Sequence, residues 1–170
     1  EIHWTQIGQS FANSGQTYTS MQLNFDGTVL AIGKPKAFSN NGEVEVYDWD
    51  GSTWIERAGI FYSEVGEEFG QVVAISDNGN VVAASGPEHD GSGSNTGVVR
   101  IFEYDGSSWT KLGQDLVGQN NNDKVETVSL NADGTRIAIN SEWNQDCGGY
   151  GCGSVHVYEY DGSTSWNQIG

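Results

Sequence analysis

The feature that most constrains this chain is an internal repeat of about 50 to 57 residues. A motif that begins with tryptophan occurs four times, as WTQIG from Trp4, WIERAG from Trp54, WTKLG from Trp109 and WNQIG from Trp166. The spacings between these tryptophans are 50, 55 and 57 residues. A period of this size is typical of propellers, solenoids and other arrays, in which each copy is one supersecondary unit. The sequence therefore predicts three copies of one unit.

The tryptophan motifs also predict where each copy begins and ends. Residues 1–8 match the end of a repeat, so we expect them to be the closing strand of a preceding unit. The three repeats then cover residues 9–58, 59–113 and 114–170, and the whole chain, 1–170, is a single segment. Because the chain begins and ends on the same motif, we expect either part of a longer propeller or an assembly of several copies.

Each repeat predicts two β-hairpins. Asp-Gly and Asn-Gly pairs stand between short runs of Val, Ile, Tyr, Phe, Trp and Thr, and such pairs tolerate the positive φ that tight hairpin turns require. The flanking residue types favour strands. Nothing in the sequence resembles a capped, amphipathic helix, so we expect an almost entirely β structure. The predicted turns are at Asp26-Gly27, Asp50-Gly51, Asn78-Gly79, Asp105-Gly106, Asp133-Gly134 and Asp161-Gly162.

Four strands per repeat predict the blades of a β-propeller. Successive residues of a strand face opposite sides, so Val44 and Val46 share one face while Tyr47 and Trp49 share the other. Both faces are apolar, and stacked blades cover both. A closed propeller needs about four to eight blades. We therefore predict an all-β fold of four-stranded antiparallel blades in a partial or self-associating propeller, whose end faces bind a partner or another copy.

The second repeat carries a family resemblance. It contains EEFGQVVAIS from Glu67 and VVAASGP from Val81, which resemble the FG-GAP repeat of integrin α-subunit-type β-propellers. Phe69-Gly70 matches the FG, and Ser85-Gly86-Pro87 stands at the position of GAP. The first and third repeats depart from both motifs. The resemblance implies a propeller fold, an extracellular or cell-surface location, and a role in adhesion.

Some FG-GAP repeats hold calcium in a loop of the form D-x-D-x-D-G, which no repeat of this chain contains. The nearest oxygen-rich loop carries Glu88, Asp90 and Asn95. Calcium takes six to eight oxygen ligands, and this loop supplies only part of such a set. A calcium site at these three residues is one interpretation, a solvated loop is the other, and no other cofactor is expected.

Charge and hydropathy exclude several classes of partner. Asp and Glu number 23 against seven Lys and Arg, which gives a net charge of −16. A surface of this charge repels the phosphates of nucleic acids and of anionic membranes. No apolar run approaches the ~20 residues needed to cross a bilayer. We expect neither nucleic-acid binding nor membrane insertion.

The two cysteines, Cys147 and Cys152, lie close together in CGGYGC. This spacing favours a small disulfide loop in an oxidising compartment. A reduced pair and a metal site that includes Asp146 are the alternatives. The disulfide interpretation agrees with an extracellular location.

The long connections between strands should gather at the rim opposite the glycine turns, and variable loops on a repeated scaffold are where binding usually occurs. Four aromatic residues there are candidate ligand-binding residues, and the alternative is that they cap the ends of the blades. They suggest a lectin-like module that binds a glycan or a protein. The candidates are Phe38, Tyr62, Trp143 and Tyr150.

Catalytic motifs are absent from the sequence. There is no nucleophile elbow, no metal-binding His-x-x-x-His helix and no phosphate-binding loop before a helix. Glu67 and Glu68 are adjacent, and adjacent residues of a strand face opposite ways, so they would not flank one glycosidic bond. We therefore expect a non-catalytic adhesion or structural scaffold module within a larger protein or assembly.

Overall fold

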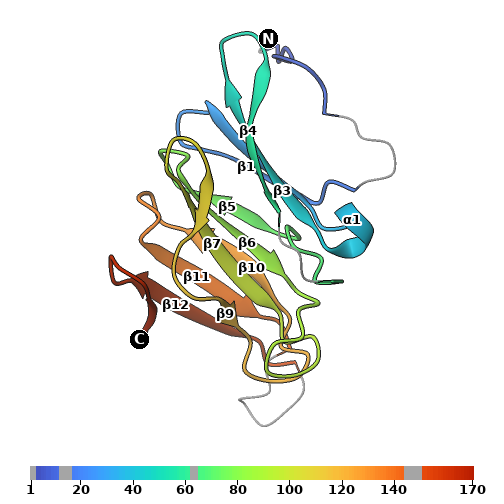
Figure 1. Ribbon diagram of the computed structural model, residues 1–170, viewed down its shortest axis with the longest axis vertical. Helices are drawn as coiled ribbons and strands as arrows, with labels where there is room; N and C mark the ends of the chain where they lie inside the picture. Colours follow the sequence, from blue (N-terminus) through green and yellow to red (C-terminus); the bar gives the residue numbers. More distant parts are fainter. Residues whose placement is uncertain (1–2, 12–16, 62–64, 144–150) are drawn as a thin grey trace.

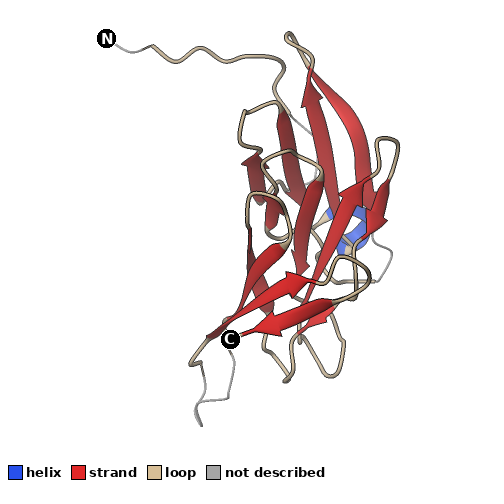
Figure 2. Cartoon of the chain, turned by 90° about the vertical axis from the view of Figure 1, so that its left-hand side faces the viewer, coloured by secondary structure: helices blue, strands red, loops and turns tan. Residues whose placement is uncertain are grey.

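The structure, a computed structural model, describes residues 3–11, 17–61, 65–143 and 151–170. These residues form three antiparallel β-sheets and one four-residue helix, α1 (Ala37–Asn40). Figure 1 shows the sheets following one another along the chain, and Figure 2 shows that the chain consists of strands and loops with very little helix. The predictions of an all-β chain and of four antiparallel strands per repeat are confirmed.

Each sheet pairs four consecutive strands in sequence order. Sheet 1 contains β1 (Ser20–Leu23), β2 (Val29–Lys34), β3 (Glu43–Trp49) and β4 (Trp54–Phe61). Sheet 2 contains β5 (Val73–Ile75), β6 (Val81–Gly86), β7 (Val98–Tyr104) and β8 (Trp109–Lys111), and β9 (Leu116–Val117) also pairs with β7. Sheet 3 contains β10 (Val125–Leu130), β11 (Arg136–Ser141), β12 (Ser154–Tyr160) and β13 (Trp166–Ile169). Sheet 1 continues through β4 past the predicted repeat boundary at residue 58, and sheet 2 continues through β9 past the one at residue 113.

All six predicted glycine turns join hairpin strands, and their glycines have φ between 73° and 99°. The turns of the first hairpins stack on one another. The Asp77 amide donates to the Ala132 carbonyl at 2.8 Å, and the Phe25 amide donates to the Asp77 carbonyl at 3.3 Å. Local turn chemistry therefore fixes the hairpins, and the turns align the sheets at one rim.

The aspartates of the second hairpin turns should titrate at unusually low pH. Asp50 accepts backbone hydrogen bonds from Thr53 and Ser52, both at 2.7 Å, and these bonds lower its pKa to about 2. A pKa below the unfolded value of 3.8 means that these bonds stabilise the fold above about pH 4 and are lost as the pH falls toward 2. We expect carboxyl NMR titrations to give midpoints near 2. Midpoints near 3.8 would contradict the turn geometry. The equivalent residues with the same shift are Asp105 and Asp161.

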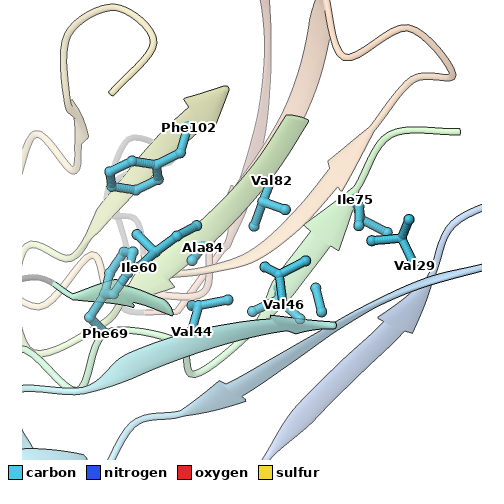
Figure 3. Packing of buried hydrophobic residues seen from close by; sticks show 11 residues of the cluster. Val29, Val44, Val46, Ile60, Phe69, Ile75, Val82, Ala84 and Phe102 are labelled. Carbon is cyan, nitrogen blue, oxygen red and sulfur yellow. The ribbon is translucent and has the colours of Figure 1, made fainter. Parts of the chain in front are cut away.

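A first hydrophobic core lies between sheets 1 and 2. Val44 and Val46 of β3 face Val82 and Ala84 of β6, and all four side chains are fully buried (Figure 3). Phe69 packs edge-on against Phe102, with ring centroids 6.0 Å apart. The alternation predicted for Val44 and Val46 is therefore confirmed.

A second core lies between sheets 2 and 3, so sheet 2 is covered on both faces. Val99 and Ile101 of β7 pack in one cluster with Ile137, Ile139 and the partly buried ring of Tyr158. The opposite face of sheet 3 differs, because Val155 is 70% exposed. Its register equivalents, Val44 and Val99, are fully buried. The sheets do not close into a ring within the described part of the chain.

Glycines allow the backbones of neighbouring sheets to touch. Gly42 forms a parallel bridge with Phe69, and Gly97 forms the equivalent bridge with Val125. A Cβ atom on Gly97 would lie 2.3 Å from the Val125 nitrogen. The same point on Gly42 would lie 2.0 Å from the Phe69 oxygen. Only glycine permits this approach, which locks each sheet to the next.

Residues 3–11 form no strand, although residues 1–8 were predicted to be a closing strand. Their end is nevertheless fixed against sheet 1. The Gln9 side chain hydrogen-bonds both the amide and the carbonyl of Trp54, at 2.9 and 2.6 Å. The ring of Phe11 packs on Tyr47, with centroids 4.7 Å apart. Whether residues 1–8 complete another sheet stays a prediction, since the structure contains no preceding sheet.

Candidate functional site

The long connections lie at the end of the sheets opposite the stacked glycine turns (Figure 1). In sheets 1 and 2, backbone hydrogen bonds join the long connection within the sheet to the segment that leads into the next sheet. The Glu68 amide donates to the Asn40 carbonyl at 2.9 Å, and the Asn122 amide donates to the Ser94 carbonyl at 2.9 Å. The rim is therefore a structured surface formed from several repeats.

The structure describes two of the four candidate aromatic residues. Phe38 is 56% exposed on the connection of sheet 1, and Trp143 is 48% exposed after β11 of sheet 3. Sheet 2 stands between these two connections, so Phe38 and Trp143 do not form one site. Tyr62 and Tyr150 lie outside the described residues. Ligand binding by these aromatics stays a prediction.

The candidate calcium residues have other partners. The Lys124 ammonium binds Glu88 at 2.8 Å, and Asp90 accepts the Asn95 amide at 2.8 Å. Within the described residues, no group of three or more His, Cys, Asp or Glu side chains could hold a metal ion. These contacts explain the shape of the loop without a cation. The calcium site stays a prediction.

A buried ion network in sheet 2 is the main feature that the sequence did not predict. The Arg100 guanidinium is fully buried and binds both Glu67 carboxylate oxygens, at 2.6 and 3.0 Å. It also donates to Asp115 at 2.9 Å, and Lys111 donates to Asp115 at 2.7 Å. Burial lowers the pKa of Arg100, but its bonds with Glu67 and the charge of Asp115 outweigh this, and the pKa is raised. Arg100 is thus held charged.

The structure corrects the expectation that Glu67 and Glu68 are residues of a strand. The two glutamates lie before β5 rather than within a strand. Glu68, with φ of 57°, pairs with Lys36, while Glu67 points into the network and contacts the His89 ring. The sequence signal for this network was an arginine between the apolar residues Val99 and Ile101 of β7.

Sheet 3 places smaller residues at the equivalent positions. Asp123 stands where sheet 2 has Glu67, and His156 stands where it has Arg100. Asp123 accepts the amides of Gln119 and Asn120, both at 2.8 Å, and its other oxygen is buried without a hydrogen-bond partner. A cavity of about 10 Å³ lies between Asp123, His156 and Ser141. Two shorter side chains leave the space that the Glu67–Arg100 pair fills in sheet 2.

Every cation of the chain is already paired. All seven Lys and Arg side chains lie within 4.0 Å of a carboxylate, including the exposed Arg136, which binds Glu159 at 2.7 Å. The excess charge of the surface is therefore acidic. An anionic ligand would have to compete with an existing ion pair at any of these side chains.

The cysteine prediction cannot be completed from the described residues. Cys152 is described, and no free cysteine occurs in the described ranges, but Cys147 lies outside them. The disulfide therefore stays a prediction. Among the helices described, none has the length and apolar character that a membrane crossing requires.

Comparisons with known proteins show similarity of fold. No protein-family model matches the sequence, and no curated protein matches it, so the FG-GAP resemblance stays an expectation. A solved structure from Bacteroides fragilis, provisionally assigned as a 6-phosphogluconolactonase, superposes with a TM-score of 0.59 at 17% identity. It matches 92% of this chain and 38% of its own.

A second similar structure is a complex of KlAtg21 with the coiled-coil of AgAtg16. It superposes with a TM-score of 0.60 at 13% identity, and the match covers 89% of this chain and 43% of that one. The present chain thus spans about two fifths of the length of these structures. At such identities the similarity shows the fold alone.

Proposed function

We propose that the chain is part of a β-propeller that serves as a non-catalytic, extracellular scaffold, and that its outer sheet face binds another blade of the same repeat. The observation that carries this proposal is the uncovered face of sheet 3. Val155 is 70% exposed there, whereas its equivalents in sheets 1 and 2 are fully buried under the next sheet.

A glycine at the edge of the same face also supports the docking of another blade on sheet 3. Gly42 and Gly97 bridge to the next sheet, and Gly153 is their equivalent in sheet 3. Gly153 keeps the positive φ of 64°, but a Cβ there would meet no atom closer than 3.6 Å. Gly153 thus has the backbone conformation that Gly42 and Gly97 use to contact the next sheet, with space beside it for another blade.

The other end of the array gives a matching argument. Gln9 binds the backbone of Trp54 in sheet 1, and Gln114 at the outer edge of sheet 2 binds Trp166 of sheet 3 in the same manner. Residues before Gln9 therefore correspond to the outer strand of a blade that would precede sheet 1. We infer that both ends of the array accept a blade.

The non-catalytic role is supported by the charges of the molecule. The similar structure provisionally assigned as a 6-phosphogluconolactonase suggests, as a competing function, an enzyme that acts on a phosphorylated sugar lactone. Such a substrate would need cations, and all seven Lys and Arg side chains of this chain are in ion pairs. The surface is acidic, and Cys147 and Cys152 have the spacing of a small disulfide loop. Both features fit an extracellular scaffold with protein or glycan partners.

Self-association tests this proposal. We expect the chain to form head-to-tail oligomers in sedimentation velocity, with the population rising over an about hundredfold concentration range. Val155→Glu places a charge on the uncovered face and should weaken association at least about tenfold. Val65→Glu, at a valine 90% exposed on a connection, is the matched control and should have no effect. A chain that stays monomeric at every concentration, or equal effects of both variants, would contradict the proposal.

A further inference from the structure

In sheets 1 and 3, a glycine-glutamine pair holds the tryptophan that begins the outer strand, Trp54 of β4 and Trp166 of β13. The Gln114 side chain donates to the Trp166 carbonyl at 2.7 Å and accepts the Trp166 amide at 2.8 Å. Gln9 makes the same two bonds with Trp54. The preceding glycines lie against the same indoles: a Cβ on Gly113 would be 2.6 Å from Trp166 Cδ1, and a Cβ on Gly8 would be 3.0 Å from Trp54 Cδ1.

Trp109 holds the equivalent position in sheet 2 but has no clamp within the described residues. The register shows the reason. Ile60 pairs with Val44, and Leu116 pairs with the equivalent Val99. In sheet 2, the residues Gly113 to Asp115 loop out before Leu116, whereas β4 of sheet 1 continues to Phe61 with only a one-residue register shift at Arg57. Sheet 1 therefore lacks the residues that would supply a glutamine to Trp109.

The missing segment leaves a pocket between sheets 1 and 2. Its volume is about 340 Å³, and its walls include Ala58, Ile60, Phe102 and Trp109. The Trp109 Nε1 atom is buried without a hydrogen-bond partner. By contrast, Trp166 Nε1 donates to the Leu112 carbonyl at 2.8 Å. An unsatisfied buried donor costs about 1–3 kcal/mol, so this pocket favours a guest that brings an acceptor.

We propose that this pocket is a binding site for an extended peptide segment of another protein that carries a Gly-Gln pair. The primary amide of the guest glutamine makes the two main-chain bonds with Trp109 that Gln9 makes with Trp54. The guest glycine lies against the indole, where a side chain would collide. A guest carbonyl accepts the Trp109 Nε1 proton, as the Leu112 carbonyl accepts that of Trp166.

The apolar part of the site selects the residue before the glycine. Ile7 precedes Gly8, and Leu112 precedes Gly113. The walls formed by Ala58 and Phe102 offer the guest an apolar surface, and the volume of the pocket is within the range of ligand sites. This site lies between two sheets of one chain, so it is independent of the blade association proposed above.

A peptide titration followed by NMR tests the site. The probe is the acetylated, amidated hexapeptide TQIGQS, which copies residues 5–10 and contains no tryptophan. We expect its addition to shift the Trp109 indole N–H signal, which Trp109→Phe identifies by its loss, while the Trp54 and Trp166 indole signals stay in place. The matched peptide TQIGES lacks the amide donor and should bind at least about tenfold more weakly.

A graft provides a second, independent measurement. Inserting Gln-Asp between Gly59 and Ile60 gives sheet 1 the same order of residues as Gly113 to Leu116. The grafted chain should melt at a higher temperature and should no longer respond to the TQIGQS peptide. Equal binding of the two peptides, no shift of the Trp109 signal, or peptide binding that survives the graft would each overturn the proposal.

Discussion

Replacing Arg100 by methionine should lower the free energy of unfolding by about 3–5 kcal/mol, because it leaves a buried carboxylate without its cation. Arg100 is fully buried and makes two hydrogen bonds with Glu67 and one with Asp115. Methionine keeps much of the apolar volume, so the loss reports mainly on the charge. Urea denaturation of the wild type and the Arg100→Met variant, at equal m-values, measures this difference.

Arg136→Met is the matched control for Arg100→Met. Arg136 also binds a carboxylate, Glu159, but its side chain is exposed. An exposed ion pair contributes about 0–1 kcal/mol, so the control should change the stability little. The double variant Glu67→Gln with Arg100→Met removes the buried charge and should recover part of the loss. Equal losses for Arg100→Met and Arg136→Met would contradict the buried network.

Replacing Gly97 by alanine should lower the free energy of unfolding by about 3 kcal/mol, through two additive causes. An alanine at φ of 75° costs about 1–2 kcal/mol in backbone strain alone. Its Cβ would also lie 2.3 Å from the Val125 nitrogen, and separating two packed backbones costs about 1–3 kcal/mol more. Denaturant unfolding measures the total.

Gly106→Ala separates the two causes. Gly106 has φ of 98° at a hairpin turn, but a Cβ there would meet no atom within 4 Å. This control should therefore lose only the strain, about 1–2 kcal/mol. A Gly97→Ala variant that is no less stable than Gly106→Ala would show that sheets 2 and 3 do not touch at Val125.

The bridges between neighbouring sheets also explain why the second repeat carries the Phe69-Gly70 motif. Phe69 is fully buried between sheets 1 and 2, and Gly70, with φ of 91°, brings its backbone against Glu43. In sheet 3, Val125 takes the position of Phe69 and bridges Gly97 in the same way. The contact requires only a buried apolar residue on one sheet and a glycine on the facing sheet. The second repeat meets this requirement with Phe69 and so resembles an FG motif, whereas the third meets it with Val125 and does not.

The sequence by itself determined the parts of this protein that depend on local chemistry. Asp-Gly and Asn-Gly pairs set the six turns, and the two-residue alternation of Val44 and Val46 set which side of β3 is buried. These features need only near neighbours along the chain and a regular period. Val155 is 70% exposed on the outer face of sheet 3, and binding of a partner or another copy at that face stays a prediction.

Only the tertiary structure decided which distant residues meet. Glu67 and Arg100 are 33 residues apart, and nothing in their local sequence pairs them. The free pocket at Trp109 arises from residues that sheet 1 lacks, so it becomes visible only when the registers of β4 and β9 are compared. Contacts between sheets depend on side-chain volume and on the spacing of two backbones. A repeated sequence sets a common scaffold, whereas small differences between its copies decide where ions are buried and where space is left.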